Sequence, residues 1–170
     1  TDGDTTPDAA VFSKADLTVN GAGSLTINGS CKHALVSKDD LVITAKDLTV
    51  NAQNVGLSGK DSVMLAEAAV NITAGSDGVR SENDTDTAKG FVSVVDSTLS
   101  IVSGNDGIQA ATVFTAENTG VSIISGGGSS ARSGSAEEWD ELEKSVISNL
   151  ADDVVVGVRG GKVIITVKKK

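Results

Sequence analysis

The sequence predicts an all-β protein built as a parallel β-helix, a solenoid with turns of about 22 residues. Small residues recur along the chain at nearly equal spacing. Each is followed by short bursts in which apolar and polar residues alternate, as they do in β-strands. The composition agrees, because Gly is abundant at 19 residues, Pro occurs once and Tyr is absent. Many short strands joined by Gly, Asn and Asp corners can be built from such a chain.

The repeat is clearest when the chain is aligned on its small corner residues. These residues are Ala10, Ala34, Gly56, Gly78 and Gly107, with spacings of 24, 22, 22 and 29. Each precedes one apolar residue: Val11, Leu35, Leu57, Val79 and Ile108. The long fourth spacing reflects a seven-residue insertion. Equal spacing over five units favours a solenoid over a β-sandwich of hairpins, which is the alternative architecture.

Two apolar pairs complete each turn, so that a turn holds three short strands. The first pairs are Leu17/Val19, Leu41/Ile43, Val63/Leu65, Val92/Val94 and Phe114/Ala116. The second pairs are Leu25/Ile27, Leu48/Val50, Val70/Ile72, Leu99/Ile101 and Val121/Ile123. One turn cannot bury its inner face alone, so stacked turns should form continuous ladders of Val, Ile and Leu. The Thr, Ser and Asn residues between pair members should point outward.

We expect one domain over residues 1–170, with solenoid turns over 7–124. A Gly/Ser-rich loop follows from Ser125 to Ser135, and helix formers with early acids predict a short helix over Ala136–Lys144. The rhythm resumes in residues 145–170, where Ser145–Val167 is interpreted as a sixth turn. The alternative for this tail is a β-hairpin cap, VVVGV-RGG-KVIITV.

The charge and the cysteine count exclude several classes of function. The formal net charge of −9 argues against nucleic acid as a partner and suits a protein that recruits cations. No apolar run approaches the length of a membrane span. The chain begins at Thr1 without a signal peptide, as a mature protein or an excised fragment would. Cys31 is alone, so no internal disulfide forms.

Two ladders of mostly acidic residues should form where the turns stack. The first lies at the corner ahead of the small residues: Asp8, His33, Val55, Asp77 and Asp106. The second lies at the corner before the next strand: Asp39 and Asp40, Asp61, the insertion Glu82–Asp86, and the tail residues Asp152 and Asp153. Carboxylates within about 5 Å of each other repel unless a cation lies between them. Ca²⁺ accepts six to eight oxygen ligands and would resolve this conflict.

The candidate calcium ligands are Asp77, Asn83, Asp84, Asp86, Asp106, Asp39 and Asp61. The insertion SENDTDTAKG supplies oxygens at adjacent and alternate positions but lacks the spacing of an EF-hand loop. The alternative is that these are solvated turn residues, with Asp39 and Asp61 paired to Lys38 and Lys60. His33 is the only His and has no suggested partner, so neither a catalytic role nor zinc is expected.

Two basic residues flank the insertion. A polysaccharide lyase needs Lys or Arg to abstract a proton, and Arg80 and Lys89 are the candidates for that base or for a carboxylate clamp. The interpretation that we prefer is that both compensate the charge of the surrounding Asp residues.

Several segments together resemble a known family. These are ADLTVNGAGSLTING, VSKDDLVIT, SGKDSV, GSDGVRSENDTDTAKG, GNDGIQA and SIISGGGSS. They are similar to the bacterial cell-surface carbohydrate-binding β-helix family, whose fold is related to that of pectate lyases. The resemblance implies a right-handed parallel β-helix, bound calcium, and binding of plant cell-wall polysaccharide without established lyase activity.

This chain departs from the family at several corners. The family's Asp-Gly corner is His33-Ala34 in one turn and Val55-Gly56 in another, so the calcium that the resemblance implies is not expected at these two corners. Its glycine-rich turns are replaced by Ala45-Lys46-Asp47, Ala66-Glu67-Ala68 and Asp96-Ser97.

We therefore expect a secreted or cell-surface, non-catalytic module that binds acidic plant polysaccharide such as polygalacturonate or pectin, with Ca²⁺ as cofactor. Cellulose is a further candidate ligand. The alternatives are a pectate lyase and a structural, adhesin-like surface solenoid. The scarcity of aromatic residues argues against a platform that stacks on neutral sugar rings. Open ends of the coil would allow end-to-end self-association.

Overall fold

The computed structural model describes residues 8–126, 153–159 and 162–168. The chain divides into two compact units, Thr1–Gly128 and Ser129–Lys170. Each is described by itself.

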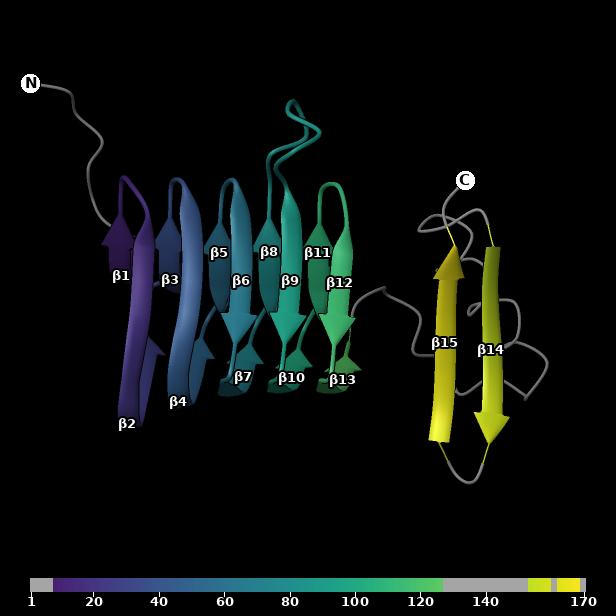
Figure 1. Ribbon diagram of the computed structural model, residues 1–170. Coiled ribbons are helices and arrows are strands. Elements are labelled where there is room, and N and C mark those ends of the chain that lie inside the picture. The colour runs from purple at the N-terminus through teal and green to yellow at the C-terminus, as the bar shows by residue number, and fades with distance from the viewer. Residues whose placement is uncertain (1–7, 127–152, 160–161, 169–170) are drawn as a thin grey trace, which may run out of the picture. The chain divides into compact units, whose positions relative to one another are not determined.

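The first unit is a coil in which parallel strands stack in three columns (Figure 1). The first column contains β1 (Ala9–Ser13), β3 (His33–Ser37), β5 (Leu57–Gly59), β8 (Val79–Ser81) and β11 (Ile108–Ala110). The second contains β6 (Ser62–Ala66), β9 (Phe91–Val95) and β12 (Phe114–Glu117), together with the first halves of β2 (Leu17–Gly29) and β4 (Asp40–Ala52). The third contains β7 (Ala69–Ala74), β10 (Thr98–Ser103), β13 (Gly120–Ser125) and the second halves of β2 and β4.

The strand register confirms the predicted repeat. In the first column Val11 lies opposite Leu35, Leu35 opposite Leu57, and Leu57 opposite Val79, which in turn lies opposite Ile108. Both apolar pairs of each turn are in register with those of the next, as in Leu48, Val70 and Leu99 of the third column. Because every strand pairing described in this unit is parallel, the β-sandwich alternative is wrong. The predicted insertion is the long loop between β8 and β9 (Figure 1).

Inward-facing residues of all three columns form one core. Leu41, Leu48, Leu57 and Val63 are fully buried, and the rows continue through Val92 in the fourth turn. This apolar burial is the main stabilising term of such a coil. The alternation predicted from the sequence is therefore the alternation between core and surface.

The small corner residues are explained by what packs against them. A Cβ atom on Gly56 would lie 2.6 Å from Cγ2 of Ile72, which belongs to the third column of the same turn. Gly78 and Gly107 meet Ile101 and Ile123 in the same way. In these three turns the third-column isoleucine therefore leaves no room for a side chain at the corner, and for Gly56 and Gly78 the carbonyl oxygen of the next corner glycine adds to this restriction.

The corners between the second and third columns also repeat. Glu67, Asp96 and Asn118 occupy equivalent places and have positive φ angles of 51°, 48° and 49°. Asn and Asp tolerate this left-handed conformation better than most residues. The Nδ2 atom of Asn118 donates a hydrogen bond of 3.1 Å to Oδ1 of Asp96. These corners take the place of the glycine-rich turns expected from the resemblance.

The second unit contains β14 (Asp153–Arg159) and β15 (Lys162–Lys168). They pair with each other in an antiparallel register, with Val154 opposite Val167 and Val156 opposite Ile165. The interpretation of Ser145–Val167 as a sixth parallel turn is therefore wrong, and these strands form the alternative hairpin. Most of the Gly/Ser loop and the predicted helix over 136–144 lie outside the described residues. Among the residues described, no helix is long and apolar enough to cross a membrane.

Candidate functional site

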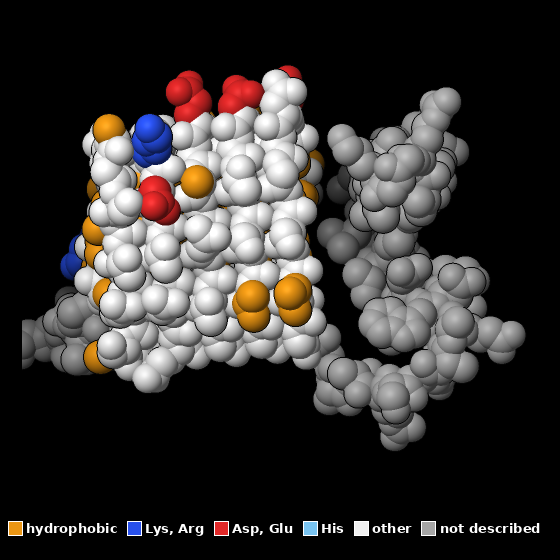
Figure 2. Space-filling model, turned by 90° about the horizontal axis from the view of Figure 1, so that it is seen from below, with side chains coloured by type: hydrophobic (Ala, Val, Ile, Leu, Met, Phe, Trp, Pro, Cys, Tyr) orange, Lys and Arg blue, Asp and Glu red, His pale blue; other side chains and the backbone are white. Residues whose placement is uncertain are grey.

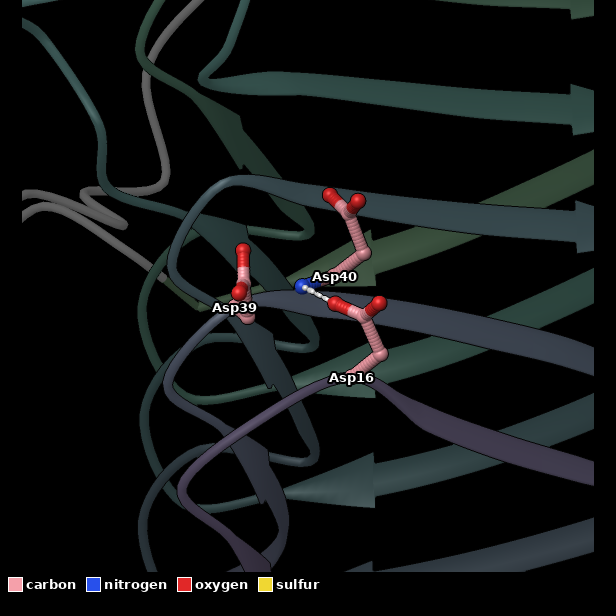
Figure 3. A group of neighbouring side chains, drawn as sticks. All are labelled: Asp16, Asp39 and Asp40. Atoms are coloured by element: carbon pink, nitrogen blue, oxygen red, sulfur yellow. Dashed lines mark hydrogen bonds between the residues drawn. The ribbon is translucent and has the colours of Figure 1, made fainter.

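Carboxylates of neighbouring turns meet at the corner between the first and second columns. Asp16 immediately precedes β2, Asp39 immediately precedes β4, and Asp40 begins β4. Figure 3 shows the three side chains on two adjacent turns of the coil. A carboxylate oxygen from each lies within 4.8 Å of one from each of the others. We call Asp16, Asp39 and Asp40 the acidic corner.

Sequence reasoning identified Asp39 and Asp40 at this corner but missed Asp16. The register places Leu17 opposite Leu41, so Asp16 lies opposite Asp40 in the turn below. The sequence contains the information needed to find Asp16, because Asp16 directly precedes Leu17 just as Asp40 directly precedes Leu41.

The acidic corner is partly satisfied by the protein. Oδ1 of Asp16 accepts a hydrogen bond of 3.3 Å from the backbone N of Asp40. Oδ1 of Asp40 accepts a hydrogen bond of 2.6 Å from Oγ of Ser62 in the turn above. The neighbouring Asp61 carboxyl group, with which the Asp39 side chain shares a hydrogen bond, raises the pKa of Asp39. Crowded carboxylates thus favour uptake of a positive charge, either a proton or a cation.

Asp61 lies next to the acidic corner in the following turn, but a lysine side chain compensates its charge. Its side chain is buried and forms an ion pair through Oδ2 with Nζ of Lys89 from the inserted loop. Its Oδ1 accepts a hydrogen bond of 2.7 Å from Nδ2 of Asn83. The Lys89 ammonium group, followed by Asn83, lowers the pKa of Asp61 to about 2. The expected alternative pairing of Asp61 with Lys60 is replaced by pairing with Lys89.

The inserted loop uses its polar side chains to hold its own shape. Oδ1 of Asn83 accepts hydrogen bonds from the backbone N and the Oγ1 of Thr85 and from the backbone N of Asp86, at 3.2, 3.0 and 3.1 Å. Oδ1 of Asp86 accepts a hydrogen bond of 2.9 Å from the backbone N of Ala88. Asp84 is exposed. Such contacts agree with the alternative that these residues only shape a turn. They also engage Oδ1 of Asn83 and Oδ1 of Asp86, which are candidate metal ligands.

Asp77 and Asp106 belong to a different corner, between the third and first columns. Asp77 is buried, and its Oδ1 accepts hydrogen bonds of 2.8 Å from Nδ2 of Asn105 and 3.3 Å from the backbone N of Asp106. Its Oδ2 lies 3.5 Å from Nη1 of Arg80. The side chain of Asp106 is exposed. Both oxygens of Asp77 are therefore engaged within the protein.

His33 lies at the same corner in an earlier turn. Its side chain is buried, its Nδ1 accepts a hydrogen bond of 3.3 Å from the backbone N of Val55, and its Nε2 lies 3.6 Å from Oδ2 of Asp8. Burial lowers the pKa of His33. The predicted ladder placed Asp8 in register with His33. The residue in register is Ala9, so that alignment was wrong by one position.

The donor set of the acidic corner fits a calcium ion. Ca²⁺ binds oxygens at about 2.3–2.6 Å, so two ligands of one ion can lie up to roughly 5 Å apart. The 4.8 Å limit among Asp16, Asp39 and Asp40 satisfies that condition. Three carboxylates leave several coordination positions for water or for a ligand's own oxygens.

The outer face of the third column offers a second, uncharged surface. Its central outward row is Thr26, Thr49, Asn71, Ser100 and Ser122, in register through the five turns. Figure 2 shows this side of the coil as largely uncharged polar side chains and backbone, with acidic side chains along one edge and a few charged and hydrophobic side chains on the face itself. In the next row the exposed apolar residues Val102 and Ile124 follow Asn28, Asn51 and Thr73. This face is flat, regular and rich in hydrogen-bonding groups.

The family model described as carbohydrate-binding domain-containing protein matches residues 1–170. The chain belongs to this family. A carbohydrate-binding domain-containing protein of Acetivibrio thermocellus is 37% identical over 49 residues, which is 29% of this chain and 17% of that protein. A solved structure, described as the polysaccharide lyase-like protein from C. thermocellum in a gadolinium derivative, has a TM-score of 0.70 and 34% identity. That match covers 74% of this chain and 50% of the solved chain.

The chain spans a small part of the curated relative and half of the solved structure. The described coil has two distinct polar surfaces, the acidic corner and the flat polar face of the third column.

Proposed function

We propose that the coil is a non-catalytic module of a secreted or cell-surface protein and binds acidic plant cell-wall polysaccharide of the pectin type with Ca²⁺. The observation that carries the proposal is the acidic corner, where Asp16, Asp39 and Asp40 converge from two turns in a carbohydrate-binding domain. A Ca²⁺ ion at this corner would take carboxylate oxygens from the protein on one side and from a uronate on the other.

The chemistry of neighbouring groups supports a cation site here. Asp61 raises the pKa of Asp39, as expected for carboxyl groups that repel each other, and a bound Ca²⁺ would relieve this repulsion. Among the other candidate ligands, Oδ1 of Asp77, Asn83 and Asp86 already accepts hydrogen bonds within the protein.

The candidate bases favour binding over lyase chemistry. Asp61 raises the pKa of Lys89, which moves that amine further from the neutral range in which a general base is effective. Nη2 of Arg80 lies 2.9 Å from Oε1 of Glu82, and Nη1 faces Asp77. Both side chains compensate nearby acids, as the preferred interpretation of the sequence holds.

Affinity electrophoresis through polygalacturonate tests the proposal. With millimolar Ca²⁺ we expect the migration of the protein to be retarded, and a chelator should abolish the retardation. The variant Asp16→Asn/Asp40→Asn should lose most of it, because two of the three carboxylates are removed. Asp96→Asn is the matched control, since it removes a charge at a corner where Asn118 already occupies the equivalent place.

Failure of the wild-type protein to be retarded by polygalacturonate would refute the proposal. An absorbance assay for unsaturated uronate, run on the same samples, should remain at background. A signal that Lys89→Ala or Arg80→Ala abolishes would establish the lyase alternative. A parallel gel with a soluble cellulose derivative tests whether the flat polar face binds neutral glucan as well.

End-to-end association is also part of the proposal. At the fifth turn, the inward residues Phe114, Val121 and Ile123 are 40%, 37% and 42% exposed within the described coil. Light scattering over a concentration series should show growth in mass, and a constant monomer mass would exclude it.

A further inference from the structure

Three lysines occupy equivalent positions in the first three turns. Ser13 lies opposite Ser37, and Ser37 opposite Gly59, so the residues that follow them, Lys14, Lys38 and Lys60, also stack. The backbone hydrogen bonds from Lys38 N to Ser13 O and from Lys60 N to Ser37 O, of 3.0 and 3.1 Å, continue that register. All three side chains are exposed. We call Lys14, Lys38 and Lys60 the lysine row.

Stacked like charges need an explanation, because they repel each other across adjacent strands about 4.8 Å apart. Within residues 8–126, no ammonium group of the lysine row lies within 4.0 Å of a carboxylate, although the chain carries a net charge of −9. The nearby acids contact other groups. Asp61 is paired with Lys89, and Asp40 accepts from Ser62.

The row has a defined end. The position after Ser81, which follows Lys60 in the ladder, is occupied by Glu82 in the fourth turn. Glu82 forms an ion pair of 2.9 Å with Arg80, so its charge is compensated within its own turn. In the fifth turn the equivalent residue is Ala111, which is uncharged. The unpaired cations are therefore confined to three consecutive turns.

The lysine row runs beside the acidic corner. Lys38 is followed directly by Asp39 and Asp40, and Lys14 is separated from Asp16 by one residue. Both groups thus lie at the passage from the first column to the second. A ligand chain that follows the coil axis at this passage meets an ammonium group once per turn and the acidic corner alongside.

We propose that the lysine row is a subsite for the carboxylates of an acidic polysaccharide, which lies along the coil axis across the first three turns. This inference rests on the proposed function and adds the direction of the glycan and the residues that recognise its charge. Each ammonium group pairs with a uronate carboxylate of that chain. Ca²⁺ at the acidic corner holds the chain from the side. Exposed pairs of this kind are sensitive to salt.

The test measures binding of an oligogalacturonide of defined length to the full chain by calorimetry, at low and at moderate salt and with Ca²⁺ present. We expect Lys38→Gln/Lys60→Gln to bind roughly tenfold more weakly than the wild type and to show a flatter salt dependence. Lys46→Gln is the matched control, because Lys46 is exposed but lies on β4 at the passage to the third column. It should bind within about twofold of the wild type.

Methyl-esterified oligogalacturonide is the second arm. Its carboxyl groups carry no charge, so the double variant and the wild type should bind it equally. If the wild type binds neither ligand, the proposed function and this inference both fail. If it binds the acid form and the double variant binds it equally well, or if Lys46→Gln loses as much affinity, the lysine row alone is rejected. Melting temperatures of all variants should match, since the exchanged side chains are exposed.

Discussion

At the scale of single residues, Asp61 shows how the insertion is tied to the coil. Its carboxylate is buried, and it is stabilised by Lys89 and Asn83, which both come from the inserted loop. A buried carboxylate needs such partners, because burial without them favours its neutral form. The inserted loop therefore stabilises the coil by compensating the buried charge of Asp61.

The depressed pKa of Asp61 predicts a pH dependence of stability. A carboxyl group with a folded pKa of about 2, below its ordinary value of 3.8, stabilises the fold above that ordinary value and loses the contribution as the pH falls toward 2. Chemical denaturation at pH 6, 4, 3 and 2 should show a steeper loss for the wild type than for Asp61→Asn. Asp84→Asn, in the exposed part of the loop, is the control and should follow the wild type. Equal pH profiles for the wild type and Asp61→Asn would contradict this assignment.

The sequence predicts which residues repeat, and it leaves open which of them make contact across an insertion. Asp16 could have been found, because it has the same place relative to Leu17 as Asp40 has to Leu41. The pairing of Lys89 with Asp61 could not, because 28 residues and an irregular loop separate them. The loop conformation depends on hydrogen bonds such as those of Asn83 Oδ1, which no periodicity encodes.

At the scale of elements, the columns were predictable to the residue because stacking demands equal register. Leu48, Val70, Leu99 and Val121 follow one another in the third column as the alignment predicted. The tail could not be assigned in this way. Alternating Val and Ile residues look the same in a parallel turn and in an antiparallel hairpin, and β14 and β15 form the hairpin.

The same substitution in one column should cost less at the fifth turn than in the middle of the coil. Val70 is 1% exposed, whereas Val121 in the same row is 37% exposed in the described coil. Val70→Ala should lower the free energy of unfolding by about 2 kcal/mol, from two buried methyl groups, and Val121→Ala by clearly less. Urea denaturation of both variants checks this. A loss for Val121→Ala as large as that for Val70→Ala would mean that the fifth turn is as well covered as the third.

At the scale of the whole molecule, the parallel coil places equivalent residues of successive turns side by side on its surface. Acids of two adjacent turns form a cluster, as at Asp16, Asp39 and Asp40, and one lysine per turn forms the lysine row. The net charge of −9 makes the acidic clusters unfavourable unless a cation is bound nearby. Stability and ligand binding should therefore be coupled through Ca²⁺.

Thermal melting with and without Ca²⁺ tests this coupling most directly. At a free Ca²⁺ concentration 100 times the dissociation constant, linkage stabilises the fold by about 2.7 kcal/mol, which corresponds to a rise in Tm of roughly 5–10 °C. We expect that rise for the wild type and for the control Asp96→Asn, and its loss in Asp16→Asn/Asp40→Asn. An unchanged Tm of the wild type between saturating Ca²⁺ and chelator, or an equal rise in all three proteins, would contradict a calcium site at the acidic corner.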